Sequence, residues 1–160
     1  MPEPFETTSP EQTVGLGATL GALLQAGDVV LLTGDLGAGK TQFTKGVARA
    51  LGVRTPVTSP TFNLMYEYAT DRGTLLRHFD LYRLDDEAQL DDIDYFGLLE
   101  DGSISLVEWG DRFPDALPPD CLTVAFELVG TQLRRLRLDA QGARGAQLLA
   151  AFGEAAADGD

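Results

Sequence analysis

The spacing of hydrophobic residues changes twice within the first third of the chain. Leucines between positions 16 and 24 recur at helical intervals. Val29–Thr33 is a short apolar run, which is typical of a strand buried in a parallel sheet. Residues 41–51 return to a helical pattern, and Gly52 is well placed to end that helix. This part of the chain therefore predicts a helix, a buried strand and a second helix.

The first of these helices has a start signal in the sequence. Ser9 can cap it, Pro10 suits its first position, and Gln12 sits where the partner residue of a capping box belongs. We therefore expect the helix to begin at Pro10.

The remaining pattern predicts strands in pairs. Residues 63–70 and 74–84 read as two strands joined by a turn at 71–73, and 121–129 and 131–139 as a second hairpin around Gly130. We further expect a loop at 52–62, short helical turns at 85–102, an apolar strand at 103–109 and a terminal helix at 143–155. The chain is thus expected to be an α/β protein with two hairpins.

Length and composition favour a single intracellular domain. The 160 residues suit one domain with one core, spanning 1–160, with about 1–7 and 154–160 expected to be frayed. No apolar run approaches the roughly 20 residues that cross a membrane, and the acidic N-terminus does not resemble a signal peptide. Cys121 is the one cysteine and is expected to be a buried thiol in a reducing compartment. These features predict a cytoplasmic protein.

The net charge of −13 changes the picture of possible partners. Binding of nucleic acid depends on Lys and Arg neutralising phosphates, so we expect no DNA binding and no direct grip on RNA. The local basic cluster Arg134, Arg135 and Arg137 is interpreted as a solvated strand face. A basic partner protein suits this surface better.

A glycine-rich motif lies between the buried strand and the second helix. Its eight residues satisfy the pattern G-x-x-x-x-G-K-[ST] at every position: Gly34, Asp35, Leu36, Gly37, Ala38, Gly39, Lys40 and Thr41. Backbone N–H groups of such a loop, with the helix N-terminus, hold phosphate oxygens. Lys40 would reach the β- and γ-phosphates, and the Thr41 hydroxyl would bind Mg²⁺. The motif predicts a P-loop nucleotide site.

Such a site also needs a carboxylate at the end of a neighbouring strand. Asp80 and Glu108 compete for this role. Glu108 follows the more apolar run, so we assign Glu108 to the metal and Asp80 to orienting or deprotonating water. The residues leave open which carboxylate does which, and either could instead cap a helix or pair with Arg83 or Arg112.

Other candidate residues are supported less directly. Thr61 lies on the loop where nucleotide switches place a hydroxyl that senses the γ-phosphate. Trp109 is either a core residue or close to the nucleotide. His78, the one histidine, is interpreted as a packed imidazole. The single asparagine, Asn63, is followed by Leu64, so the Asn-Lys-x-Asp element of guanine sites is missing and ATP is favoured.

Four motifs together resemble one family. The sequences GDLGAGKT, SPTF, HFDLYRL and VEW with a following LP occur in the order and approximate spacing of the bacterial TsaE (YjeE) family, over about Thr8 to Arg137. The resemblance implies a P-loop NTPase with a mixed parallel and antiparallel central sheet flanked by helices. It also implies that Thr41 and Glu108 bind Mg²⁺, and that Asp80 is a second essential carboxylate. Four further residues would meet the nucleotide: Thr61, Trp109, and, at the adenine end, Ser9 and Gly130.

The resemblance further implies a function. The family consists of small ATPases needed to form threonylcarbamoyladenosine on tRNA, next to the anticodon. Its members dock on a TsaD-type transferase subunit and a TsaB-type partner, while TsaC supplies the adenylate, so tRNA is met only through the complex. We therefore expect an ATPase, weak alone and stimulated by its partners. The alternatives are a small-molecule kinase, which the absence of Arg and Lys from residues 85–101 disfavours, and a nucleotide sensor that does not hydrolyse ATP.

Overall fold

One mixed sheet organises the molecule. The computed structural model describes residues 4–34, 39–55, 65–81, 88–92, 94–108 and 118–158. Within these residues the sheet has seven strands in the order β1-β7-β6-β2-β5-β4-β3. The strands are β1 Phe5–Thr7, β2 Val29–Gly34, β3 Met65–Ala69, β4 Leu75–Asp80, β5 Ile104–Glu108, β6 Cys121–Val129 and β7 Leu133–Gln141. The predicted mixed sheet is confirmed.

Parallel strands form the centre of this sheet and antiparallel strands its edges. β4, β5, β2 and β6 are parallel neighbours. β3 pairs antiparallel with β4, and β7 with both β6 and β1. The two predicted hairpins are therefore β3–β4 and β6–β7, with Gly73 and Gly130 at positive φ in their turns. Both hairpin predictions are confirmed.

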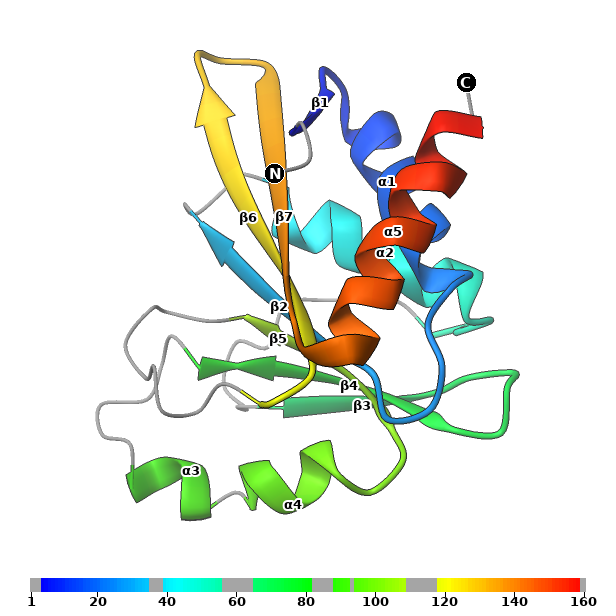
Figure 1. Cartoon of the computed structure of the whole chain (residues 1–160), viewed down its shortest axis with the longest axis vertical. Helices are drawn as coiled ribbons and strands as arrows, with labels where there is room; N and C mark the ends of the chain where they lie inside the picture. Colours follow the sequence, from blue (N-terminus) through cyan, green and yellow to red (C-terminus); the bar gives the residue numbers. More distant parts are fainter. Residues whose placement is uncertain are drawn as a thin grey trace.

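Helices cover the sheet on both faces. α1 (Pro10–Gly21), α2 (Lys40–Ala50) and α5 (Gly142–Asp158) lie on one face, and the short α3 (Ala88–Asp92) and α4 (Tyr95–Leu99) on the other (Figure 1). Alternate residues of β2 enter the two cores: Leu32 packs under α1 and α2, whereas Leu31 belongs to the core with α3 and α4. This two-sided burial is why β2 lacks a polar face.

Helix α1 begins as predicted, with a shifted capping box. The Ser9 Oγ accepts a hydrogen bond from the Gln12 backbone N–H at 3.2 Å. The Gln12 side chain accepts from the N–H of Thr8 at 2.7 Å, one residue before the cap. The exchange of bonds satisfies N–H groups that the helix leaves open and fixes residues 8–9 against its first turn.

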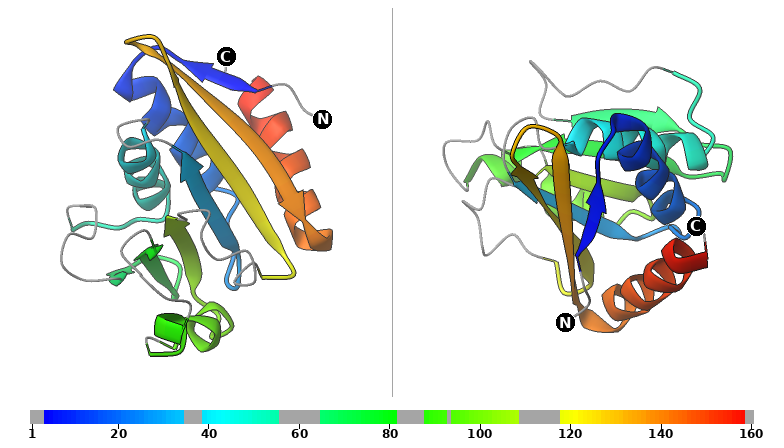
Figure 2. Two further views of the ribbon diagram at one scale, coloured as in Figure 1. Left: turned by 90° about the vertical axis from the view of Figure 1, so that its left-hand side faces the viewer. Right: turned by 90° about the horizontal axis from the view of Figure 1, so that it is seen from above.

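Both ends of the chain contain more structure than expected. Residues 1–7 were expected to be frayed, but Phe5–Thr7 form β1, which pairs with β7 at the sheet edge (Figure 2). Residues 154–158 were also expected to fray, yet α5 runs to Asp158. Phe5 contacts Phe152 with ring centroids 5.0 Å apart, and this packing ties the two ends together.

Candidate nucleotide-binding site

Glycines with left-handed backbone conformations stand at the end of β2 and at the start of α2. Gly34, the last residue of β2, has φ 122°, and a Cβ there would lie 2.1 Å from the Phe126 carbonyl oxygen on β6. Gly39 precedes α2 with φ 106°. Only glycine adopts these conformations without strain. Asp35, Leu36, Gly37 and Ala38, the centre of the predicted phosphate loop, lie outside the described residues.

The N-terminus of α2 has the properties of an anion site. No side chain caps this helix, and its first turn contains no acidic residue. Lys40 is the first helical residue, Thr41 follows it, and the Lys40 ammonium donates to the Gly34 carbonyl at 2.9 Å. Lys40 thus bridges the two ends of the loop from a buried position. Helix dipole and ammonium together favour a bound phosphate.

Two carboxylates end adjacent strands beside this loop. Asp80 is the last residue of β4 and Glu108 the last of β5, and the two are register partners. Glu108 also pairs with Leu32, two residues before Gly34. Both carboxylates are buried. The structure therefore brings Asp80 and Glu108 together at the carboxyl edge of the parallel strands, where α/β proteins bind ligands.

This donor set fits Mg²⁺ better than a caged structural cation. Within the described residues, no group of three or more His, Cys, Asp or Glu side chains could hold a metal ion. Mg²⁺ instead uses one or two carboxylates, a hydroxyl, waters and substrate phosphates. Asp80 and Glu108 are the candidate carboxylates, and Thr41 is the candidate hydroxyl. Thr61 and Trp109, which the sequence analysis also placed here, lie outside the described residues.

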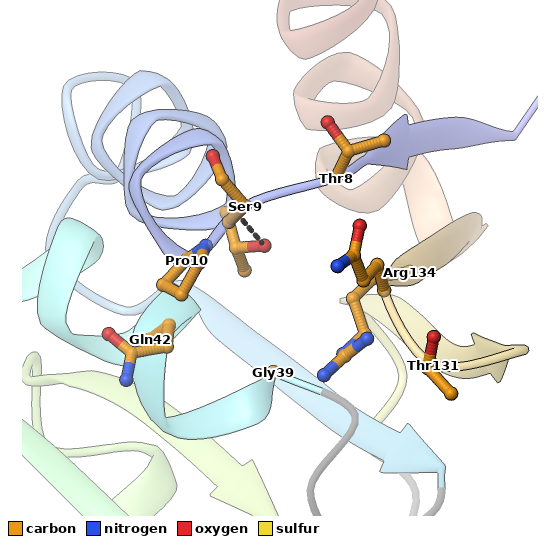
Figure 3. Close-up of a pocket in the computed structure, with 9 residues that line it drawn as sticks. Thr8, Ser9, Pro10, Gly39, Gln42, Thr131 and Arg134 are labelled. Atoms are coloured by element: carbon orange, nitrogen blue, oxygen red, sulfur yellow. Dashed lines mark hydrogen bonds between the residues drawn. The ribbon is translucent and has the colours of Figure 1, made fainter.

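A cavity of about 430 Å³ opens on the other side of Gly39 (Figure 3). It lies between the N-termini of α1 and α2 and the β6–β7 turn. Its lining is Thr8, Ser9, Pro10, Thr13, Gly39, Gln42, Thr131, Gln132 and Arg134. Of the two residues predicted at the adenine end, Ser9 lines the cavity. Gly130 does not line it, but its neighbour Thr131 does. Gly39 is common to the loop and the cavity, so a ligand could extend from one into the other.

Arg134 is placed differently from its basic neighbours. Arg135 forms an ion pair with Glu6 at 3.1 Å, and Arg137 is exposed. Arg134 reaches from β7 into the cavity (Figure 3). Its Nη1 is buried and has no hydrogen-bond partner among the described residues. The expectation of a solvated face was therefore wrong for Arg134. Strand alternation was the available signal, because Arg134 shares a face with the buried Leu136 and Leu138.

A charged cluster on the opposite face of the sheet holds α4 in place. The Arg77 guanidinium donates to Glu67 at 2.8 Å, to Ser103 Oγ at 2.9 Å and to the Leu98 carbonyl at 3.2 Å. It also donates to Asp101, and this hydrogen bond lowers the pKa of the Asp101 carboxyl. The cluster joins β3, β4 and the α4–β5 turn, so it is structural support for β4 and β5.

Within the described ranges, no helix is both long enough and apolar enough to cross a bilayer.

Comparison with known proteins identifies relatives over most of the chain. The family model "Threonylcarbamoyl adenosine biosynthesis protein TsaE" matches residues 7–136. The tRNA threonylcarbamoyladenosine biosynthesis protein TsaE of Bacillus subtilis is 37% identical over 88% of this chain and 87% of its own length. That of Aquifex aeolicus is 39% identical over 81% and 90%.

A solved structure agrees with these sequence relatives. The crystal structure of Bacillus subtilis YdiB superposes with a TM-score of 0.75 and 32% identity, covering 94% of this chain and 93% of that one. The fold is accordingly that of a P-loop NTPase with a mixed sheet. The matched segment contains the loop, both carboxylates and Ser9. On these grounds the chain belongs to the TsaE family of tRNA threonylcarbamoyladenosine biosynthesis proteins.

Proposed function

We propose that this TsaE-family chain binds ATP with Mg²⁺ and hydrolyses it to ADP and phosphate in the cytoplasm. It acts on a complex of TsaD-type and TsaB-type partners and does not transfer the threonylcarbamoyl group itself. The observation that carries the proposal is that Asp80 and Glu108 end neighbouring strands, while Lys40 of α2 bonds to Gly34 at the end of the adjacent strand β2. A cation at a helix N-terminus beside two carboxylates is the arrangement that phosphoryl transfer requires.

Each residue has a distinct task in this proposal. The α2 N–H groups and Lys40 hold the phosphates, and Lys40 exchanges its bond to the Gly34 carbonyl for phosphate oxygens. Thr41 and Glu108 would hold Mg²⁺, which neutralises charge on the β- and γ-phosphates when bound. The cavity beside Gly39, with Ser9 and the turn at Gly130, receives the adenosine end.

In this proposal Asp80 orients and deprotonates the attacking water. Its carboxylate accepts a hydrogen bond from the attacking water and takes up its proton as the water oxygen bonds to the γ-phosphorus. The bond from that phosphorus to the β–γ bridging oxygen then breaks, giving ADP and phosphate. Thr61 would sense the γ-phosphate, and a partner that orders its loop would orient the water. Hydrolysis is therefore weak until the partners bind.

The test is ATP hydrolysis by the protein alone and with a TsaB–TsaD pair. We expect the pair to raise turnover severalfold and Lys40→Ala to lower it on the order of 100-fold or more. Lys45→Ala is the matched control, because Lys45 lies exposed on the same helix. No stimulation and no binding of the pair would remove the partner role, and stoichiometric phosphorylation of a metabolite would favour a kinase.

A second variant separates hydrolysis from sensing. If ATP is hydrolysed, Asp80→Asn should bind ATP with unchanged affinity and lose turnover. If ATP only changes partner affinity, Asp80→Asn should leave partner binding and release intact. Calorimetric ATP binding, phosphate release and ATP-dependent binding of the TsaB–TsaD pair, measured on the same preparation, distinguish the two.

A further inference from the structure

The side chain of His78 is fully buried and, among the residues that the structure describes, its ring forms no hydrogen bond. It lies in the middle of β4 with no exposed surface, between Tyr66 of β3 and Leu106 of β5. Both ring nitrogens, Nδ1 and Nε2, are buried and have no hydrogen-bond partner in the described part of the chain. A polar group buried in this way costs about 1–3 kcal/mol of stability. A hydrophobic side chain would fill the same space without that cost, so the imidazole calls for an explanation.

The explanation lies on the neighbouring strand. His78 shares the α2 side of the sheet with Leu76 and Asp80, because side chains on a strand alternate. Its Nε2 is 3.6 Å from Oε2 of Glu108, just beyond hydrogen-bond length. A movement of a few tenths of an ångström by the carboxylate would bring the two atoms within bonding distance.

We propose that His78 is a positioning residue for Glu108, which rests on the proposed role of Glu108 as a Mg²⁺ ligand. The imidazole donates its Nε2–H to Oε2, which would leave Oε1 available as the Mg²⁺ ligand. Carboxylate ligands of metals are commonly held by such outer partners, and loss of the partner typically costs about 10- to 100-fold in metal affinity or activity. His78 itself touches neither metal nor nucleotide in this proposal.

The first test is the Mg²⁺ dependence of ATP binding, measured by calorimetry. His78→Phe keeps the bulk of the ring and removes the donor, whereas a Gln side chain carries a donor at similar reach. We expect His78→Phe to raise the Mg²⁺ midpoint about 10- to 100-fold, with ATP affinity in Mg²⁺-free buffer unchanged. His78→Gln should recover part of the loss. An unchanged midpoint in His78→Phe would overturn the proposal.

A double-mutant cycle excludes a purely structural effect. In a Glu108→Gln background the carboxylate is gone, so adding His78→Phe should shift the Mg²⁺ midpoint no further. Equal shifts in both backgrounds would show that His78 acts on the fold and not through Glu108. Circular dichroism and thermal melts of all four proteins establish that they are folded.

A measurement on unmutated protein covers the case in which His78→Phe does not fold. His78 is the one histidine in the chain, so ¹⁵N-histidine labelling gives the Nδ1 and Nε2 signals of a single imidazole ring. We expect a proton on Nε2 whose resonance shifts on addition of Mg²⁺ and ATP, and shifts differently in Glu108→Gln. An Nε2 without a proton would overturn the proposal. If the protein binds no ATP, the proposed function fails, while the resting Nε2 signal still tests the contact with Glu108.

Discussion

In the candidate site, the surroundings of a residue depend on which face of its strand it occupies. Arg134 and Arg135 are adjacent in sequence, yet Arg134 faces the cavity beside Gly39 and Arg135 pairs with Glu6. The Nη1 of Arg134 is buried, and no described residue forms a hydrogen bond with it. A bound nucleoside could therefore supply the acceptor or ring face that this guanidinium lacks.

Arg134→Ala should weaken ATP binding roughly 10- to 100-fold, because a hydrogen bond to a charged group contributes about 1.5–3 kcal/mol. Inorganic tripolyphosphate lacks the base and ribose, so its affinity should barely change. Competition calorimetry with the two ligands measures both effects. Arg137→Ala removes the same charge from an exposed position of β7 and is the control. Equal weakening of both ligands would place Arg134 at the phosphates instead.

At the scale of elements, the position of α2 depends on its packing against α1. A Cβ at Gly46 of α2 would lie 2.0 Å from the Val14 carbonyl oxygen of α1. The helices therefore touch backbone to backbone, and α1 holds the helix whose N-terminus forms the candidate anion site. Gly15 of α1, in contrast, has open space around it.

Gly46→Ala should lower the free energy of unfolding by about 1–3 kcal/mol, because the helices must separate to admit the methyl group. Gly15→Ala should raise it by about 0.5–1 kcal/mol, since alanine favours the helix and meets no neighbour. Urea unfolding of the two variants checks the opposite signs. A stability gain in Gly46→Ala would contradict the close helix contact.

The ion pairs of Arg77 should make the stability of the protein depend on pH in the acidic range. The hydrogen bond from Arg77 lowers the pKa of Asp101 below its ordinary value of 3.8. The stabilisation is therefore complete above that value and disappears as the pH falls through the lower, folded-state pKa. Asp101→Asn should be less stable at neutral pH, and its deficit should shrink below about pH 4. Urea unfolding at several pH values measures the deficit in stability. The control is Glu154→Gln, which changes an exposed carboxylate of α5. A deficit that is constant with pH would contradict it.

At the scale of the whole molecule, the single cysteine reports on global opening. Cys121 begins β6 in the interior of the sheet and is 2% exposed. Burial raises the pKa of its thiol, so the reactive thiolate is scarce at neutral pH. A thiol reagent should therefore modify Cys121 only when the sheet opens.

Ligand binding should slow that modification. With ATP and Mg²⁺ at 100 times the dissociation constant, the folded state gains about 2.7 kcal/mol, which corresponds to roughly 100-fold slower labelling. Lys40→Ala should show no such protection. The rate is measured from the absorbance of the coloured leaving group that the thiol reagent releases. Rapid labelling of the native protein would mean that β6 opens locally, without global unfolding.

Much of the architecture could be predicted because it is encoded in local spacing. The buried run at Val29–Thr33, the glycines of the hairpin turns and the Ser9 cap each act over a few residues. β1 could not be predicted, since three residues are too few to show alternation. The extent of α5 was also missed, because its last turns carry a run of alanines whose packing the pattern does not reveal.

The sequence by itself determined the phosphate-loop motif, the helix and strand types and the identity of both carboxylates, since each is a property of neighbouring residues. Tertiary structure alone decided that Asp80 lies beside Glu108, that His78 faces Glu108, and that Arg134 faces the cavity. The reason is physical. Strand register and order follow from packing two cores against one sheet, and the residues joined there are distant in the chain.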